Sequence, residues 1–155
     1  MTIGAILKGK GNEVVSVEGS ALVRDVIAML AARRIGCVPV VEGGTVAGIF
    51  SERDVIYRLG GEGVSMLDRP VREVMTSPAV LTSPDTGIVS ALALMTKRRI
   101  RHLPVVKDGA LVGFVSIGDL VKYRIDRIEE EAAAMRDYIQ SRSEEHTSEL
   151  QSLRH

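Results

Sequence analysis

The sequence predicts an α/β (α+β) fold made of two tandem units, each with the element order β-α-β-β-α. The main observation is an internal repeat: VPVVEGGTVAGIFSERD (38–54) recurs without a gap as LPVVKDGALVGFVSIGD (103–119), 65 positions later. In both copies this stretch follows a run with apolar residues every three or four positions, the pattern of an amphipathic helix. Because a unit of roughly 50 residues buries too little apolar surface to be stable alone, we expect the two units to pack as one body.

The first unit is expected over residues 3–61. It begins with a helical lead-in at 2–8 and a brief strand at 14–17. Ser20 is placed to cap the following helix, and Gly36 is placed to end it. Four apolar residues form the buried stripe of that helix: Val23, Val26, Ile27 and Leu30.

A β-hairpin and a second helix complete the first unit. The β-branched run CVPVV (37–41) predicts a buried strand, and TVAGIF (45–50) predicts its partner. Three residues separate the two, and a loop of this length that ends in glycine is typical of a tight hairpin. The helix that follows Ser51 is expected to reach Leu59, where GGEG (60–63) breaks it.

The second unit is expected over residues 79–124 and repeats this plan. Residues 62–78 are interpreted as a linker that contains VREVMT, a lead-in to the second unit. A strand follows at 80–82, and the next helix is expected to start at Pro84-Asp85.

Two further segments follow the repeat. Residues 125–141 predict an amphipathic C-terminal helix, because their apolar residues fall along one side. From Arg142 the chain reads RSEEHTSELQS, which resembles the in-frame translation of a widely used sequencing adapter. We therefore attribute residues 142–155 to a technical artefact, expect them to be disordered and expect the natural C-terminus to be missing. A natural, polar, disordered tail is the alternative.

The composition argues against a nucleic-acid or membrane partner. The chain has 20 Lys and Arg against 20 Asp and Glu, so no net charge attracts it to DNA or to an anionic bilayer. With no Trp and two Phe, it offers few platforms on which single-stranded bases could stack. No stretch approaches the ~20 apolar residues of a membrane helix, and the N-terminus lacks a signal-peptide core. We therefore expect a cytoplasmic protein, with the single Cys37 in a buried strand rather than as a catalytic thiol.

The turn before the last helix of each unit carries the candidate chemistry. In the first copy, Gly48 allows a ligand or a backbone to approach closely. Ser51 lies where the first N–H groups of a helix are unpaired, which is a ready anion site. Arg53 adds a guanidinium that matches phosphate, and Asp54 adds an acceptor for ribose hydroxyls. Together these residues are typical of a nucleotide half-site.

A structural interpretation explains the same residues. Ser-x-x-Asp before an apolar run is also a capping box, in which Ser51 and Asp54 satisfy each other at a helix start. For one copy considered alone, the cap is the favoured interpretation. Gly48 would then only relieve crowding in the hairpin, and Arg101 and His102 would be a surface charge and a strand-edge residue.

Two tandem units that carry (V/L)PVV, a glycine-ended turn and G-h-h-S-x-x-D resemble a pair of CBS (cystathionine-β-synthase) domains, the Bateman module. The resemblance covers residues 3–124 and is present in both copies. It implies a pseudo-two-fold sandwich with two clefts that bind adenosyl ligands: AMP, ADP, ATP, NAD(H) or S-adenosylmethionine. It also implies that two chains pair into a disc-shaped homodimer.

The resemblance implies roles for individual residues. Asp54 and Asp119 would bind ribose hydroxyls, and Ser51 and Ser116 would meet ribose or phosphate at the helix starts. Strand residues beside the two prolines, and those after the two glycines, would line the base pocket. The implied ligand-binding set is Val38, Pro39, Gly48, Ile49, Ser51, Arg53, Asp54, Thr82, Arg101, His102, Leu103, Pro104, Gly113, Phe114, Ser116 and Asp119.

The two copies differ at two arginines. Arg53 has Gly118 as its counterpart in the second copy. Arg101, where members of the family often place a basic phosphate contact, has Gly36 as its counterpart in the first. Because each cleft of the family borrows residues from both units, the sequence leaves open which cleft holds these arginines. One occupied and one empty cleft is consistent with it.

The sequence thus favours a regulatory module and not an enzyme. The module would bind AMP, ATP, ADP or NAD(H) and act as an energy or metabolite sensor on an unknown effector protein, through ligand-biased conformation or dimer geometry. The alternatives are a structural homodimerisation module with degenerate clefts and an N-terminal fragment of a larger CBS-regulated protein. No metal site or catalytic residue is expected, because the sequence shows no Cys/His cluster and no nucleophile–base pair outside the repeat.

Overall fold

The structure, a computed structural model, describes residues 1–11 and 13–153, with side chains described as far as residue 145. The chain divides into two compact units, Met1–Leu120 and a second that begins at Val121. The first unit contains both copies of the repeat, so the expectation that they pack as one body is confirmed.

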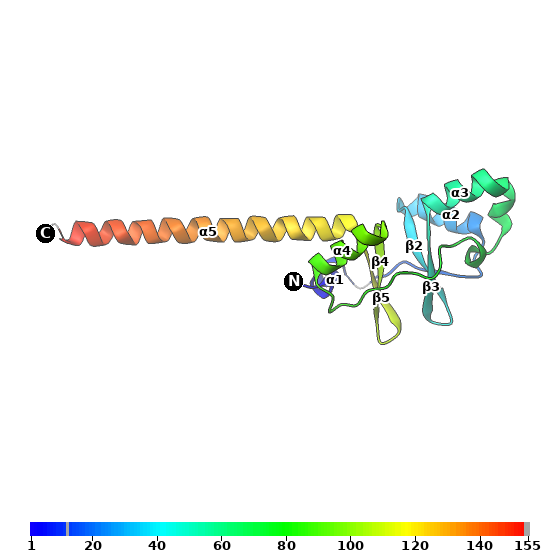
Figure 1. Cartoon of the computed structure of the whole chain (residues 1–155), viewed down its shortest axis with the longest axis horizontal. Coiled ribbons are helices and arrows are strands. Elements are labelled where there is room, and N and C mark those ends of the chain that lie inside the picture. The colour runs from blue at the N-terminus through cyan, green and yellow to red at the C-terminus, as the bar shows by residue number, and fades with distance from the viewer. Residues whose placement is uncertain (12, 154–155) are drawn as a thin grey trace. The chain divides into compact units, whose positions relative to one another are not determined.

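The first copy forms a three-stranded sheet in the order β1-β2-β3. Figure 1 shows β2 beside β3. β1 (Val17–Glu18) lies parallel to β2 (Cys37–Glu42), and β2 lies antiparallel to β3 (Thr45–Ser51). The strand expected at 14–17 starts later and is shorter, since only Val17 of that run pairs with β2.

The second copy keeps the hairpin in the same register. β4 (His102–Lys107) and β5 (Ala110–Ser116) are antiparallel, with a bulge at the same place as in the first copy. The strand expected at 80–82 is reduced to one parallel bridge between Thr82 and Val105. This bridge is the counterpart of the β1–β2 pairing in the first copy.

Both hairpins close with two residues in the left-handed region of φ/ψ space, as a type I′ turn requires. Gly43 and Gly44 have φ values of 59° and 80°, and Asp108 and Gly109 have values of 52° and 80°. Each turn is therefore one residue shorter than the expected three-residue loop.

The helices before the hairpins end differently from the prediction. α2 (Val23–Arg33) and α4 (Ile88–Arg98) are each followed by an arginine in the left-handed region, Arg34 with φ 54° and Arg99 with φ 55°. The N–H groups of that arginine and of the next residue close onto carbonyls of the last turn, which is a Schellman motif. The expectation that Gly36 ends the helix is therefore wrong.

These two helices also start later than expected. The N-cap of α2 is Leu22 rather than Ser20, and the N-cap of α4 is Gly87 rather than Pro84 or Asp85. Neither leucine nor glycine has a side-chain acceptor, so both helices start without a side-chain cap. The N–H of Val23 instead donates to the Arg69 carbonyl at 2.9 Å, so a distant backbone segment does the work of the cap.

The two lead-in segments are exchanged between the copies. α1 (Ile3–Lys10) packs against the second copy, where the N–H of Ile3 donates to the Thr86 carbonyl at 2.9 Å. Figure 1 shows α1 beside α4. The segment expected to lead into the second copy contains the 3₁₀ helix η2 (Val71–Glu73) and packs against the first, where Val71 N–H donates to the Ala21 carbonyl at 2.7 Å.

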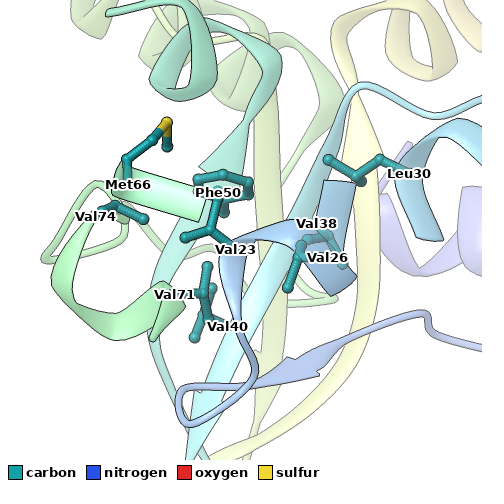
Figure 2. Close-up of a cluster of buried hydrophobic side chains, with 9 residues drawn as sticks. All are labelled: Val23, Val26, Leu30, Val38, Val40, Phe50, Met66, Val71 and Val74. Carbon is teal, nitrogen blue, oxygen red and sulfur yellow. The ribbon is translucent and has the colours of Figure 1, made fainter. Parts of the chain in front are cut away.

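The exchange builds the core of the first copy. α3 (Glu52–Glu62) continues past the expected end at Leu59 and is followed by the 3₁₀ helix η1 (Gly63–Asp68). Side chains of α2, β2 and β3 meet those of η1 and the η2 segment in one buried cluster (Figure 2). Its members are Val23, Val26, Leu30, Val38, Val40, Phe50, Met66, Val71 and Val74.

The last helix of the repeat and the predicted C-terminal helix are one element. α5 (Ile117–Leu153) is continuous, whereas a separate helix over 125–141 and disorder from residue 142 onward were expected. Extending an existing helix costs far less than starting one, and the glutamates of the tail are good helix formers. Residues 154–155 lie outside the described part of the chain. Within the described residues, no helix is long and apolar enough to cross a bilayer.

Candidate ligand-binding clefts

Both Ser-x-x-Asp motifs form a capping box at a helix start. In the first copy the Ser51 N–H donates to Asp54 Oδ2 at 2.9 Å, and the Asp54 N–H donates to Ser51 Oγ at 3.4 Å. In the second copy the Ser116 N–H donates to Asp119 Oδ2 at 2.8 Å, and the Asp119 N–H donates to Ser116 Oγ at 3.0 Å. The predicted capping box is therefore confirmed in both copies. Ligand binding has to be argued from what surrounds each box.

A cavity of about 370 Å³ lies beside the second capping box, and we call it the Asp119 cleft. Its walls come from α1 and the residues after it, from the α2–β2 connection of the first copy, and from the β4–β5 hairpin of the second. It is lined by Leu7, Lys10, Gly11, Glu13, Val14, Val15, Ile35, Gly36, Cys37, His102, Gly113, Phe114, Ser116 and Asp119. Its volume lies within the range of small-molecule sites, about 300–1,000 Å³.

Lys10, on the α1 helix that precedes the first copy of the repeat, reaches the Asp119 carboxylate of the second copy. Its Nζ lies 2.7 Å from Asp119 Oδ2 and donates to the Phe114 carbonyl at 3.2 Å. Burial raises the pKa of Asp119, but hydrogen bonds from Lys10 and from the Ser116 backbone, with the charge of Lys10, hold that pKa below its ordinary value. Asp119 is therefore ionised at neutral pH, the state in which a carboxylate accepts hydrogen bonds from hydroxyl groups.

An aromatic pair forms part of the same wall. The rings of His102 and Phe114 are stacked, with their centroids 5.3 Å apart and their planes 15° from parallel. Burial lowers the pKa of His102; the charge of Asp119 opposes this, and those of Lys10 and Arg101 add to it. The imidazole is therefore neutral at neutral pH, so the pair offers a flat surface without charge.

A smaller cavity of about 180 Å³, the Asp54 cleft, lies beside the first capping box. It is lined by Gly36, Cys37, Ile49, Ser51, Glu52, Arg53, Asp54, Thr76, Arg99, Ile100, Arg101 and His102. The two arginines that distinguish the copies, Arg53 and Arg101, thus lie in the same cleft, together with Arg99. This answers the question that the sequence left open.

The carboxylate of Asp54 is already hydrogen-bonded at both oxygens. Oδ2 accepts from the Ser51 N–H at 2.9 Å and from Ser51 Oγ at 3.2 Å. Oδ1 accepts from Thr76 Oγ1 at 2.8 Å. A ribose hydroxyl that bound here would have to share Oδ1 with Thr76, which belongs to the lead-in segment before the second copy of the repeat.

Ten of the sixteen predicted ligand-binding residues line one of the two clefts or both. Ile49, Ser51, Arg53, Asp54 and Arg101 line the Asp54 cleft; Gly113, Phe114, Ser116 and Asp119 line the Asp119 cleft; His102 lines both. Six others line neither cavity and are buried: Val38, Pro39, Gly48, Thr82, Leu103 and Pro104. Val38 and Leu103, for example, are fully buried, so their side chains fill the interior and not a ligand pocket.

The two glycines make room for the exchanged lead-in segments. A Cβ on Gly48 would lie 2.5 Å from the Thr76 carbonyl oxygen, where Thr76 and Ile49 form an antiparallel bridge. A Cβ on Gly113 would collide with the Leu7 side chain of α1. Close approach is therefore required, as the sequence predicted, and the approaching group at both positions is the protein's own chain.

The lining residues that sequence reasoning missed lie mostly in the lead-in segments and in the connections between α2 or α4 and the hairpin that follows it. Lys10 and Thr76 reach the two aspartates, yet they lie far from the motif in sequence. The ends of the two lead-ins, at Gly11 and Thr76, are 65 positions apart, and this register was the available signal. Cys37, the counterpart of His102, lines both cavities.

The chemistry of Cys37 fits a structural position. Burial, reinforced by the negative charge of Asp54, raises the pKa of the thiol to about 12, so it is protonated at neutral pH. Among the residues whose side chains the structure describes, no group of three or more His, Cys, Asp and Glu is placed to hold a metal ion.

Comparison with known proteins agrees with this architecture. The family model of the CBS domain matches residues 11–61 and 71–126. The CBS domain-containing protein CBSX3 of Arabidopsis thaliana, a mitochondrial protein, is 34% identical over 151 residues, which cover 90% of this chain and 72% of that protein.

Solved structures share the fold. The CBS-domain containing protein ATU1752 from Agrobacterium tumefaciens has a TM-score of 0.75 and 35% identity, covering 80% of this chain and 99% of that chain. The CBS domain pair of protein MJ0100, solved with 5′-methylthioadenosine and S-adenosyl-L-methionine, has a TM-score of 0.71 and 20% identity, covering 82% and 98%. With two matched segments that coincide with the two copies of the repeat, the chain belongs to the CBS-domain family and carries a tandem pair of CBS domains.

Proposed function

We propose that this chain is a regulatory module, not an enzyme, that binds an adenosyl ligand (AMP, ADP, ATP or NAD(H)) between its two CBS domains. The observation that carries the proposal is the Asp119 cleft. It combines an ionised carboxylate at a helix start with an uncharged aromatic surface, in a cavity large enough for a small molecule.

The donors and acceptors of the cleft suit a nucleoside. Lys10 and the Ser116 N–H both bond to Oδ2 of Asp119, which leaves Oδ1 as the acceptor for a ribose hydroxyl. Val14, Val15 and the Phe114 ring supply apolar surface for a base. Lys10 is accompanied by Glu13 and Asp119, so the charge of the cleft suits a ligand with one phosphate better than a triphosphate.

Adenosyl compounds are bound by another protein with this fold. The CBS pair of MJ0100 holds two adenosyl compounds, and this chain has the same fold. The proposal for this chain rests on its own residues: at 20% identity the likeness to MJ0100 supports the fold alone.

The position of the cleft suggests how binding would be transmitted. A ligand there touches α1, the α2–β2 connection of the first copy and the hairpin of the second copy at once. It would therefore favour the conformation in which these three segments lie together, which is a population shift. An effector protein or a homodimer interface sensitive to that conformation would make the module an energy or metabolite sensor.

The Asp54 cleft favours a second, structural role. Both oxygens of Asp54 bond to the protein itself, so this capping box fastens the Thr76 segment to the first copy. We assign ligand binding to the Asp119 cleft and fastening to the Asp54 cleft. The alternative of a dimerisation module without ligand extends this second role to both clefts.

Native mass spectrometry of protein purified without added nucleotide tests the proposal. We expect one retained adenosyl compound per chain, or, in ligand-free protein, a higher melting temperature with AMP, ADP, ATP, NADH or S-adenosylmethionine. A ligand at 100 times its Kd adds ~2.7 kcal/mol to the free energy of unfolding. No retained compound and no shift with any of the five would overturn the proposal in favour of the structural module.

A further inference from the structure

The part of α5 after Leu120 carries a seam of exposed apolar side chains. Their spacing alternates strictly between four and three residues over almost three heptads, which is the pattern of a coiled coil. The seam consists of Val121, Ile125, Ile128, Ala132, Met135 and Ile139. All six are exposed, with 41% of Val121 and 59% of Ile139 accessible to solvent. Apolar side chains in such a row have a strong tendency to pack against a second apolar surface.

In heptad notation, Ile125, Ala132 and Ile139 occupy a positions, and Val121, Ile128 and Met135 occupy d positions. The next d position is Arg142, the first residue of the adapter-like segment. The seam therefore lies entirely within the part of α5 that precedes that segment.

The residues that flank the seam specify an orientation. Arg124 and Glu131 occupy g positions, and Glu129 and Arg136 occupy e positions. In a parallel, in-register pair, each g residue faces the e residue five positions later on the second helix. Arg124 would then face Glu129 of the second chain, and Glu131 would face Arg136 of the second chain. Both pairs join opposite charges.

The antiparallel arrangement is disfavoured by the same residues. An antiparallel pair that buries the whole seam has its centre at residue 130, because Val121 then lies opposite Ile139. This brings Glu129 and Glu131 of one chain close to Glu129 and Glu131 of the other chain, so that four negative charges lie together.

The width of the seam indicates two strands. Bundles of three or more helices bury e and g positions as well, and here most of these positions are charged. We propose that residues 121–139 of α5 form a parallel, in-register, two-stranded coiled coil with a second copy of this chain.

Thiol crosslinking of the full chain tests the arrangement. Met135→Cys places a thiol in the seam, and Glu130→Cys places one on the opposite face of the helix, where the Glu130 side chain is 68% exposed. With a short bismaleimide, Met135→Cys should give a product of two chains, whereas Glu130→Cys and the unchanged protein, whose Cys37 is buried, should not. Equal crosslinking of both variants, or none for a Met135→Cys protein with unchanged melting temperature, overturns the proposal.

Charge reversal tests the orientation. Arg124→Glu in the Met135→Cys protein should lower the crosslinking yield at limiting concentration on the order of fivefold, because both symmetry-related ion pairs are lost. Adding Glu129→Arg should restore the yield. Residues five apart do not face each other on one helix, so the restored yield has to come from an ion pair between the two chains. No rescue, crosslinking of Met135→Cys only to an Ile125→Cys partner, or a product of three chains would contradict a parallel, two-stranded coil.

Discussion

The Asp54 and Asp119 clefts use one motif in two ways. Each has a serine and an aspartate in a capping box, placed by hairpins of identical register. At Asp54 a threonine of the lead-in segment takes the second carboxylate oxygen, and a cavity of about 180 Å³ remains. At Asp119 a lysine shares the oxygen already used by the cap, and the cavity is about 370 Å³. The exchanged lead-in segments, and not the repeated motif, therefore decide which cleft has room for a ligand.

The largest expected difference between the clefts is in stability, at the two glycines. Gly48→Ala places a methyl group against the Thr76 carbonyl oxygen, a backbone atom that cannot move without breaking the bridge to Ile49. We expect a loss of roughly 3 kcal/mol in the free energy of unfolding. Gly113→Ala meets only the end of the Leu7 side chain, which can rotate away, so we expect about 1 kcal/mol or less.

Urea unfolding of the two variants measures both losses. Circular dichroism should show that each variant is folded before its midpoint is compared with that of the unchanged protein. Equal losses, or a larger loss for Gly113→Ala, would contradict the view that backbone closes the first cleft and a flexible side chain borders the second.

The next effect concerns ligand affinity. Asp119→Asn keeps an acceptor for the Ser116 N–H but removes the charge that strengthens hydrogen bonds from ribose hydroxyls, so we expect a loss of at least about tenfold in affinity. Asp54→Asn is the matched control and should change affinity less than about threefold, since Asp54 bonds to Ser51 and Thr76. Titration calorimetry with the adenosyl compound that binds best gives both values. If Asp54→Asn costs more affinity than Asp119→Asn, the clefts have been assigned in the wrong order.

The sequence predicts the parts of this arrangement that depend on local pattern. The repeat, the hairpins and both capping boxes follow from alternation, turn glycines and the Ser-x-x-Asp spacing. The pairing of segments far apart in sequence does not, because nothing local states that α1 packs on the second copy and η2 on the first. For that reason Lys10 and Thr76 were missed, and Val38 and Leu103 were assigned to a pocket although they are fully buried.

Helix ends show the same limit. Ser20 is a good N-cap by residue type, but α2 starts at Val23 because the Arg69 carbonyl accepts from its N–H. Gly36 is a good terminator by type, but Arg34 adopts the left-handed conformation two residues earlier. At the start of α2 a tertiary contact outweighs a local preference worth about 1 kcal/mol. At its end the hydrogen bonds of the Schellman motif, from Arg34 and Ile35 to the last turn, end the helix before Gly36 is reached.

A smaller effect is expected at the Lys10–Asp119 ion pair. The pKa of Asp119 is depressed in the folded state, so its contribution is present above the unfolded value of about 3.9 and is lost as pH falls through the folded pKa. Lys10→Met should therefore destabilise the protein at pH 7 by less than about 1 kcal/mol, since the pair is partly exposed, and the difference should vanish in acid.

Lys8→Met is the control, because Lys8 is exposed on the same helix and its replacement removes the same charge. Thermal melts of the three proteins from neutral pH to about pH 3 give the comparison. A destabilisation by Lys10→Met that is the same at every pH would show that the lysine acts by packing and not by its charge on Asp119.

The smallest effect distinguishes the matched residues His102 and Cys37. Burial lowers the pKa of His102 from the ordinary value of 6.5, so the unfolded chain binds more protons than the folded one in the interval between the two pKa values. Stability should therefore fall as pH drops through about 6.5, and His102→Gln should remove this slope. Cys37, with a pKa of about 12, does not titrate in this interval, so the first copy has no equivalent of the effect.

Unfolding free energies measured in small steps from about pH 7.5 to 5 resolve the slope, and an unchanged slope in His102→Gln would assign it to another group. A nucleoside that covers the His102–Phe114 surface would bury the imidazole further and steepen the slope, which links this small effect to the occupancy of the Asp119 cleft.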